Sequence, residues 1–138
     1  MDIKNLVLSD EAVNIIDNGT WVDNLPGADG VSLFVTGMES EAAKAAMISA
    51  QADARMKNKG EPLTALQHSD ATRKVLADVV LKDWKGLTDN GKEIDYDKQL
   101  AKQWITSRNG ERFAGLVLIA AQRVDAMAGE FAEKVAKN

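Results

Sequence analysis

The chain has 138 residues, of which 45% are hydrophobic but only 5% aromatic, and its 17 basic and 21 acidic residues leave a net charge of -4. This length is typical of a single domain, and the absence of cysteine excludes a disulfide framework, a thiolate nucleophile and a cysteine-ligated zinc site. The excess of acidic residues argues against a nucleic-acid partner. The sequence has no signal-peptide layout and no run of the ~18 consecutive apolar residues that a membrane span needs. We therefore expect a soluble intracellular protein.

Residues 1–38 are the acidic part of the chain, with six acidic residues and one basic residue. A short helix is predicted over 11–17. Ser9 is its expected N-cap, and Gly19 stands where a left-handed C-cap is needed.

Two strands are expected next, at 20–23 and 31–36, because both stretches are rich in β-branched and aromatic side chains. The turn residues at 25–30 allow them to pair as a hairpin. Helices must cover this hairpin, since an isolated hairpin is marginally stable in water.

An alanine-rich helix is predicted over 40–58, where helix propensity is high but large side chains are few. Gly60 and Pro62 end it. Such a helix either packs closely against a neighbour or packs weakly, and its sequence leaves both options open.

Thr64 and Gln67 have the spacing of a capping box and begin another helix, which is predicted to reach about Lys82. Its large apolar residues recur at helical spacing. They predict a core stripe of Leu66, Val75, Leu76, Val79 and Val80.

The helical pattern stops over 83–97, where Asn90 and Gly91 indicate a tight hairpin-like turn, because both central positions of that turn favour positive φ. Asp97 is the expected N-cap of the next helix. Residues 107–110 then interrupt the helical pattern.

The longest predicted helix covers 111–136, with an apolar stripe of Phe113, Leu116, Val117, Ala120, Val124, Met127, Phe131 and Val135. These elements predict an α+β, mainly α-helical fold with a small N-terminal strand pair, about four principal helices and a short hairpin-like turn. We expect one domain over 1–138, with a strand-containing part at 1–38 and a helical part at 39–138.

The segment Gly-Leu-Thr-Asp-Asn-Gly-Lys at 86–92 matches the first seven positions of a phosphate-binding loop. The eighth position fails, because Glu93 stands where serine or threonine would hold magnesium. An extended segment follows instead of a helix. We therefore interpret the match as chance.

The acidic residues over 83–97 do not form a calcium loop, because Gly91 lacks the preceding array of alternating aspartates and no glutamate closes the loop. His68, the only histidine, stands beside polar residues near a helix start, which indicates a solvated position. No nucleophile and base pair stands out. We predict no catalytic, cofactor-binding or metal site, and a protein that is not an enzyme.

Trp21, Trp84 and Trp104 stand out in a chain with few aromatic residues. We interpret tryptophans here as corners of the core, with the alternative that one of them anchors a partner. Trp84 is the candidate for partner binding, because we expect it at a helix end beside a turn, with one ring edge in solvent.

Residues 79–96 resemble the most recognisable segment of tail assembly chaperones from long-tailed, siphovirus-type bacteriophages. In that family a helix ends in a tryptophan, here Trp84, before a turn glycine, here Gly86. An Asp-x-Gly-Lys turn, here 89–92, then leads into an extended Ile-x-Tyr. The Gly-x-Trp-Val at 19–22 also resembles the family's start, so the resemblance covers nearly the whole chain.

The resemblance implies a non-enzymatic protein of the host bacterial cytoplasm that is absent from the finished virion. Such chaperones bind the tape-measure protein, a long helical chain, keep it soluble and recruit tail-tube protein around it. Self-association into a homo-oligomer is a further expectation. The alternative is a structural tail protein, such as a tube or tail-completion subunit, although tube subunits are dominated by β-structure.

In many members of that family a ribosomal slip near the end of the gene produces a longer second form. The last three residues here, Ala136, Lys137 and Asn138, can be encoded as GCA-AAA-AAY, which is a slippery run. We hypothesise that this chain is the short form, and a gene without a slippery heptamer or an overlapping frame would refute this.

Overall fold

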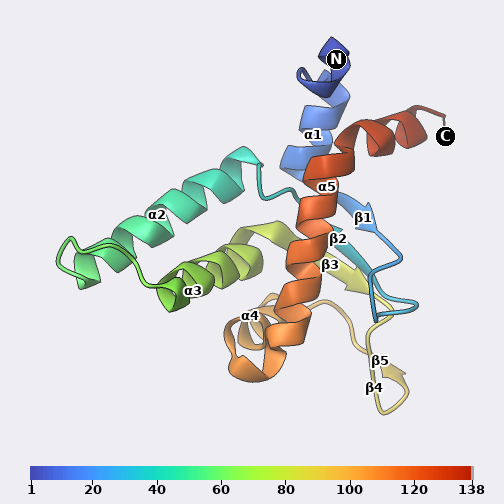
Figure 1. The fold of residues 1–138 in the computed structure, drawn as a ribbon. Helices are drawn as coiled ribbons and strands as arrows, with labels where there is room; N and C mark the ends of the chain where they lie inside the picture. The colour runs from blue at the N-terminus through green and yellow to red at the C-terminus, as the bar shows by residue number, and fades with distance from the viewer. Residues whose placement is uncertain (138) are drawn as a thin grey trace.

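The computed structural model describes residues 1–137, except the side chain of Asn5, and these residues adopt a mainly helical α+β fold (Figure 1). The predicted fold class is therefore confirmed. Asn138, the last residue of the slippery run, lies outside the described residues. In Figure 1 the long helix α5 (Glu111–Lys137) crosses the sheet, and its last turns lie at the same end of the molecule as the N-terminus.

The N-terminal residues 1–8 form an arm that includes a short 3-10 turn, η1 (Ile3–Asn5). Helix α1 (Asp10–Asn18) follows, and the Ser9 hydroxyl accepts a hydrogen bond from the Ala12 N–H at 3.1 Å. Gly19 ends the helix with φ +95°. The predicted short helix and its N-cap are confirmed.

The larger sheet in residues 1–137 has the strand order β1-β2-β3, with both pairs antiparallel. Its strands are β1 (Thr20–Val22), β2 (Ser32–Val35) and β3 (Leu81–Lys85). The pairing of β1 with β2 is the predicted N-terminal strand pair. The third strand was not predicted and joins residues about 50 positions further along the chain, as the register pairs Leu33 with Trp84.

The two faces of this sheet differ in burial. Val22, Leu33 and Trp84 lie opposite one another across the strands and are all buried, on the face that packs against the core. Trp21 and Phe34 form a pair on the opposite, half-exposed face, with ring centroids 5.4 Å apart. One face of the sheet is thus covered, as the predicted hairpin required.

The prediction of a helix that reaches Lys82 is wrong in its last part. Helix α3 (Ala65–Val75) continues into a wider π-helical turn, η2 (Leu76–Val80), and residues 81–85 are strand β3. The run of valine and leucine before Trp84 suits a strand as well as a helix. Pairing with β2 decides for the strand, because it satisfies backbone groups that β2 would otherwise expose.

The Asn90–Gly91 pair forms the predicted hairpin turn between β4 (Thr88–Asp89) and β5 (Lys92–Glu93), with φ values of +52° and +80°. The chain around the phosphate-loop-like sequence is therefore strand, turn and strand. It does not provide the helix N-terminus that a phosphate-binding loop uses.

Two other helices begin at a side-chain cap, of which the one at Asp97 was predicted. Helix α2 (Glu41–Lys57) starts at Ser40, whose hydroxyl accepts from the Ala43 N–H. Helix α4 (Lys98–Thr106) starts at Asp97, whose carboxylate accepts two backbone N–H groups of the first turn. Local side-chain capping thus positions both helices.

Helix α5 is not straight, because Met127 has the non-helical angles φ -118° and ψ 15°. The predicted stripe is only partly right from this bend onward: Phe131 is partly buried against the core, whereas Met127 is 36% and Val135 is 66% exposed. Ala128 and Ala132 are buried in their place. Ala128 and Ala132 continue the buried series of Val117, Ala121 and Val124 at helical spacing, so the same face of α5 stays covered through the bend.

Candidate interaction surface

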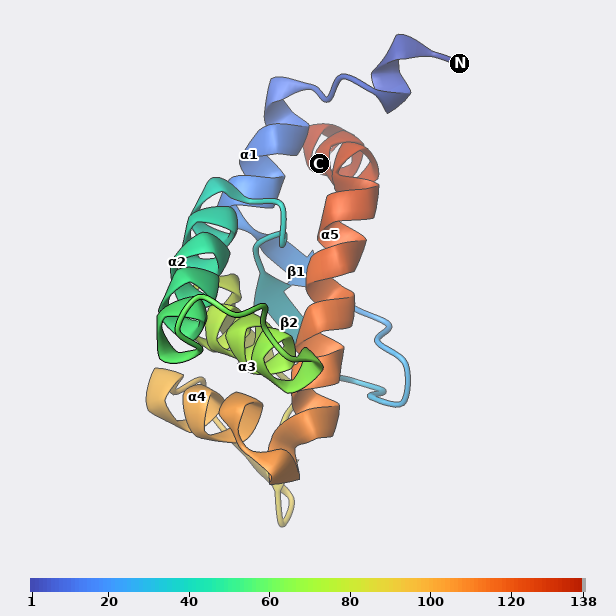
Figure 2. The same cartoon turned by 60° about the vertical axis from the view of Figure 1, so that its left-hand side comes forward.

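Helices α2 and α3 form a hairpin that projects from the sheet and α5 (Figures 1 and 2). Their connection is held by side-chain amides: Asn58 and Gln67 exchange two hydrogen bonds, of 2.6 and 2.7 Å. Thr64 and Gln67 form the predicted capping box, and Asn58 also donates to the Pro62 carbonyl. These hydrogen bonds join the two helices at the end of the hairpin that points away from the body.

The first turn of α2 is fixed to the body by two carboxylates. Asp125 of α5 accepts the backbone N–H groups of Met38 and Glu39 at 3.0 and 3.1 Å. Asp17 of α1 accepts the N–H of Glu41 at 3.1 Å. Both carboxylates lie at the N-terminal end of α2, where the helix dipole favours a negative charge. Because the two acids belong to α1 and α5, these two helices together orient α2 relative to the body.

Asp125 is the acid of this anchor whose pKa is shifted. Burial is the main cause that raises the pKa of Asp125 above the ordinary value of 3.8, and the negative charge of Glu39 raises it further. The hydrogen bonds from the Glu39 and Met38 N–H groups act in the opposite direction and lower the pKa. Gly37 lies against the same carboxylate, and a Cβ there would collide with Asp125 Oδ1. Sequence reasoning missed this anchor, because Asp125 resembles any charged residue of an amphipathic helix.

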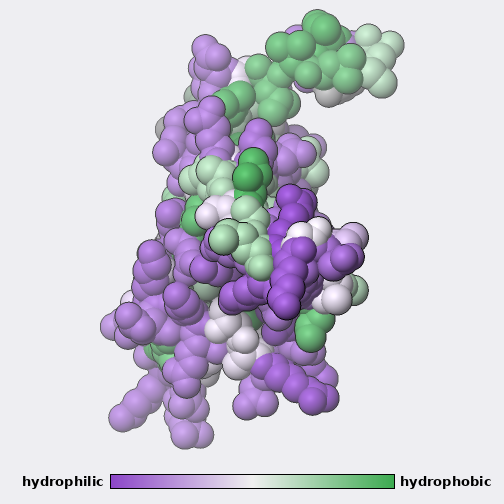
Figure 3. Space-filling model, turned by 90° about the vertical axis from the view of Figure 1, so that its left-hand side faces the viewer, coloured by the Kyte–Doolittle hydropathy of each residue, from purple (hydrophilic) through white to green (hydrophobic). Residues whose placement is uncertain are grey.

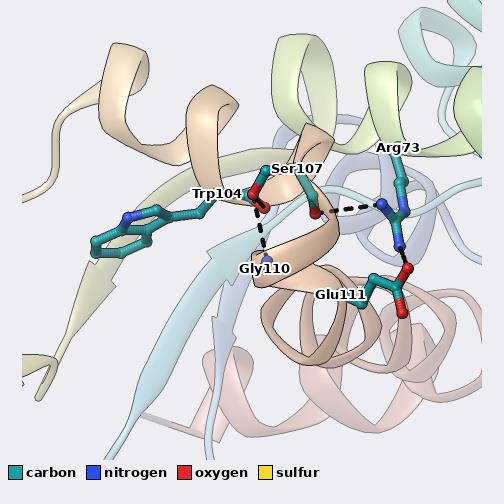
Figure 4. A network of polar contacts seen from close by, with 5 residues as sticks. All are labelled: Arg73, Trp104, Ser107, Gly110 and Glu111. Atoms are coloured by element: carbon teal, nitrogen blue, oxygen red, sulfur yellow. Dashed lines mark hydrogen bonds and ion pairs between the residues drawn. The ribbon is translucent and has the colours of Figure 1, made fainter.

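A second anchor joins α3 to the turn between α4 and α5 (Figure 4). The Arg73 guanidinium donates to the Ser107 carbonyl and lies 3.4 Å from Glu111 Oε1. The Ser107 hydroxyl donates to the Trp104 carbonyl at 3.1 Å and accepts the Gly110 N–H at 3.3 Å. Glu111 is 59% exposed, so its ion pair contributes at most about 1 kcal/mol, and the network chiefly orients the base of the hairpin.

The outer side of α2 is the surface that these anchors present. Within Glu41–Lys57, all of which the structure describes, Ala43 is the one buried residue. Four exposed apolar residues repeat at helical spacing along the outer side, and we call them the α2 face: Ala45, Ile48, Ala52 and Met56. Ile48 and Met56 are 69% and 79% exposed, so no other part of the described chain covers the outer side of the alanine-rich helix.

Leu66, predicted to belong to the core stripe of α3, is instead 71% exposed. It lies in the first turn of α3, at the end of the hairpin that is furthest from the sheet. Helical periodicity alone therefore predicted burial for a side chain that the core does not reach. Figure 3 views the molecule from this side and shows a small strip of hydrophobic surface among hydrophilic side chains.

The expectation that Trp84 ends a helix with a solvent-exposed edge is wrong. Trp84 lies in β3, is 4% exposed and donates from Nε1 to the Ile94 carbonyl at 2.7 Å. Its ring stacks on Trp104 at 5.3 Å and meets the edges of Phe113 and Tyr96. Partner binding by Trp84 stays a prediction, and the burial of the ring argues against it. The surroundings of Trp84 fit the other interpretation, that of a tryptophan packed in the core.

The other singled-out residues lie apart from one another. His68 is exposed, as predicted. Trp21 lies on the open face of the sheet, with Lys85 Nζ 4.0 Å from its ring centroid. Among residues 1–137, acidic and histidine side chains form no group of three that could hold a metal ion, and no helix is long and apolar enough to cross a membrane.

The family model described as YdaY prophage protein matches residues 38–138. The chain belongs to the YdaY prophage protein family. The matched residues contain the complete α2–α3 hairpin, and the family assigns the chain a phage origin. No curated protein and no solved structure matches the chain.

Proposed function

We propose that this phage-derived chain is a tail assembly chaperone without enzymatic activity, which binds the tape-measure protein in the host bacterial cytoplasm and promotes assembly of tail-tube protein around it. The family supports the phage setting, and the resemblance of residues 79–96 supports the chaperone role. The α2 face carries the proposal, because it is a firmly anchored helical surface with exposed apolar side chains. Such a surface suits an amphipathic helix of a client.

The size of the α2 face suits reversible binding. Complete burial of Ile48 and Met56 would contribute at most about 3–6 kcal/mol. Because association also costs free energy, the dissociation constant of one such contact is no lower than roughly tens of micromolar. A long client that is bound by several copies gains avidity from their number, and each copy still leaves easily when tube subunits replace it.

A structural tail protein, such as a tube or tail-completion subunit, is the alternative. The mainly helical fold supports it less well than it supports a chaperone, because tube subunits depend on extensive β-structure, and the larger sheet in residues 1–137 has three short strands. Presence of the chain in purified virions from its phage would favour this alternative, whereas a chaperone is absent from them.

Co-expression with a fragment of the tape-measure protein tests the proposal. We expect the fragment to move from the insoluble to the soluble fraction when this chain is present, and the two proteins to purify together. A fragment that is equally insoluble with and without this chain would refute the chaperone function.

Substitutions on the α2 face test the binding surface. We expect the double variant Ile48→Asp with Met56→Asp to lose most of the solubilising effect and to keep its fold by circular dichroism, because both side chains are exposed. Val135→Asp is the matched control, since Val135 is also an exposed apolar residue, at 66%, but lies on α5. Equal solubilisation by all three proteins would exclude the α2 face as the client site.

A further inference from the structure

The N-terminal arm, residues 1–8, has apolar side chains that nothing in its own chain covers well. Ile3, Leu6 and Val7 are 64%, 68% and 63% exposed, and Leu8 is 42% exposed. Figure 2 shows the arm extending beyond α1, and Figure 3 shows it as a continuous hydrophobic surface. Contiguous exposed apolar residues of this kind mark an interaction site.

A groove of about 780 Å³ lies between the arm and the last turns of α5. Val7 and Leu8 line it on the side of the arm. Small residues of α5 line the opposite side: Ala126, Gly129, Ala132 and Ala136. A Cβ added at Gly129 would meet no other atom within 4 Å, so the side of the groove formed by α5 has room for further side chains.

The acidic residues that α1 and α5 contribute to the groove are complementary in charge to Lys4 of the arm. Glu11 of α1 and Glu130 and Glu133 of α5 line the groove, and Lys4 of the arm is its one basic lining residue among those described. The other charged residue of the arm, Asp2, accepts the Lys4 N–H at 3.0 Å and does not line the groove. An apolar segment that carries a lysine is therefore the kind of occupant that the groove attracts.

We propose that the α1 and α5 side of the groove binds the arm of a second copy of this chain in place of its own arm, and that two copies exchange their arms around a twofold axis. Each copy then supplies an apolar, lysine-bearing arm and an acidic groove with small side chains. Such an interface is self-complementary, so it closes after two subunits. The proposal uses the arm and α5, and it is independent of the α2 face and of the chaperone function.

Engineered cysteines test this exchange directly, because the chain contains no cysteine of its own. A Leu6→Cys variant is mixed with a tagged Gly129→Cys variant under mild oxidation. We expect a disulfide-linked heterodimer on a non-reducing gel, and much less of the corresponding product when Ile48→Cys replaces Gly129→Cys. Equal crosslinking of both pairs would overturn the proposal, because it would indicate random collision.

The double variant Leu6→Cys with Gly129→Cys separates exchange from closure within one copy. Exchange predicts a product of dimer mass. A product of monomer mass would mean that the arm covers its own groove, which overturns the proposal.

Sedimentation and charge reversal give a second test. We expect Lys4→Glu to raise the dimer dissociation constant by about two- to tenfold, as befits exposed charges, and Glu130→Lys with Glu133→Lys to restore dimerisation in the Lys4→Glu background. Ile48→Asp is the control and should leave the dimer intact. A monomer at all concentrations of the unmodified chain, or dissociation by Ile48→Asp, would overturn the proposal.

Discussion

Helices α2 and α5 use the same residue for opposite purposes. Each contains seven alanines. In α5 five of them are buried, namely Ala114, Ala120, Ala121, Ala128 and Ala132, whereas in α2 Ala43 alone is buried within the helix. The difference lies in the neighbours: α5 packs against the sheet, α1 and α4, while α2 packs mainly against α3.

This comparison shows that alanine content does not by itself indicate a core helix. In α5 the small side chains let several elements approach the helix closely, and each buried alanine fills a space that a larger residue would not fit. In α2 alanine mainly stabilises the helix through its high intrinsic propensity. The exposed Ile48 and Met56 then remain for a partner.

The largest effect is expected at the start of α5, where Phe113 packs against Trp84. We expect Trp84→Ala to lower the free energy of unfolding by about 3–5 kcal/mol, because it empties a buried site and breaks the bond to Ile94. Urea denaturation measures this. Trp21→Ala, on the half-exposed face of the sheet, is the control with a smaller expected loss, and equal losses would contradict the burial difference.

A matched pair of alanine substitutions tests the comparison itself. We expect Ala121→Leu in α5 to cost about 1–3 kcal/mol, because the site is fully packed. Ala52→Leu, on the α2 face, should change stability by no more than about 0.5 kcal/mol. Thermal and urea unfolding measure the stability of both variants. Similar stability changes in the two would contradict the difference between α2 and α5.

The anchor between the two helices should have a more moderate effect. We expect Asp125→Ala to lower the free energy of unfolding by about 1–2 kcal/mol, because it removes the acceptor of two backbone N–H groups. The loss stays moderate because the Glu39 N–H can donate to water instead. Hydrogen exchange should then increase first at Met38 and Glu39. Unchanged exchange at both amides would show that Asp125 does not hold α2.

The smallest effect is the pH dependence of the same anchor. Burial raises the pKa of Asp125 above 3.8, so the folded state holds its proton more tightly than the unfolded state. The contribution of Asp125 to stability is therefore largest below pH 3.8 and declines as the pH rises through the raised pKa. As the pH rises from 3.8 through the raised pKa, the free energy of unfolding of the wild type should fall relative to that of Asp125→Asn. NMR titration of the Asp125 carboxyl group measures the pKa directly, and a midpoint at or below 3.8 would contradict the expected shift.

Much of the secondary structure follows from short stretches of sequence. The caps at Ser9, Thr64 and Asp97 and the turn at Asn90 and Gly91 were predictable, because each depends on residues within a few positions. The candidate surface was only partly predictable. The sequence indicated an alanine-rich helix with few large side chains, but it gave no sign that carboxylates of α1 and α5 would anchor it.

The sequence by itself therefore determined where helices and turns begin, since capping and turn chemistry are local. The tertiary structure alone decided that residues 81–85 form a strand beside β2, that Leu66 and the α2 face stay exposed, and that α5 bends at Met127. The physical reason is that burial depends on which elements meet in space. An apolar stripe has the same period whether a neighbour covers it or leaves it for a partner.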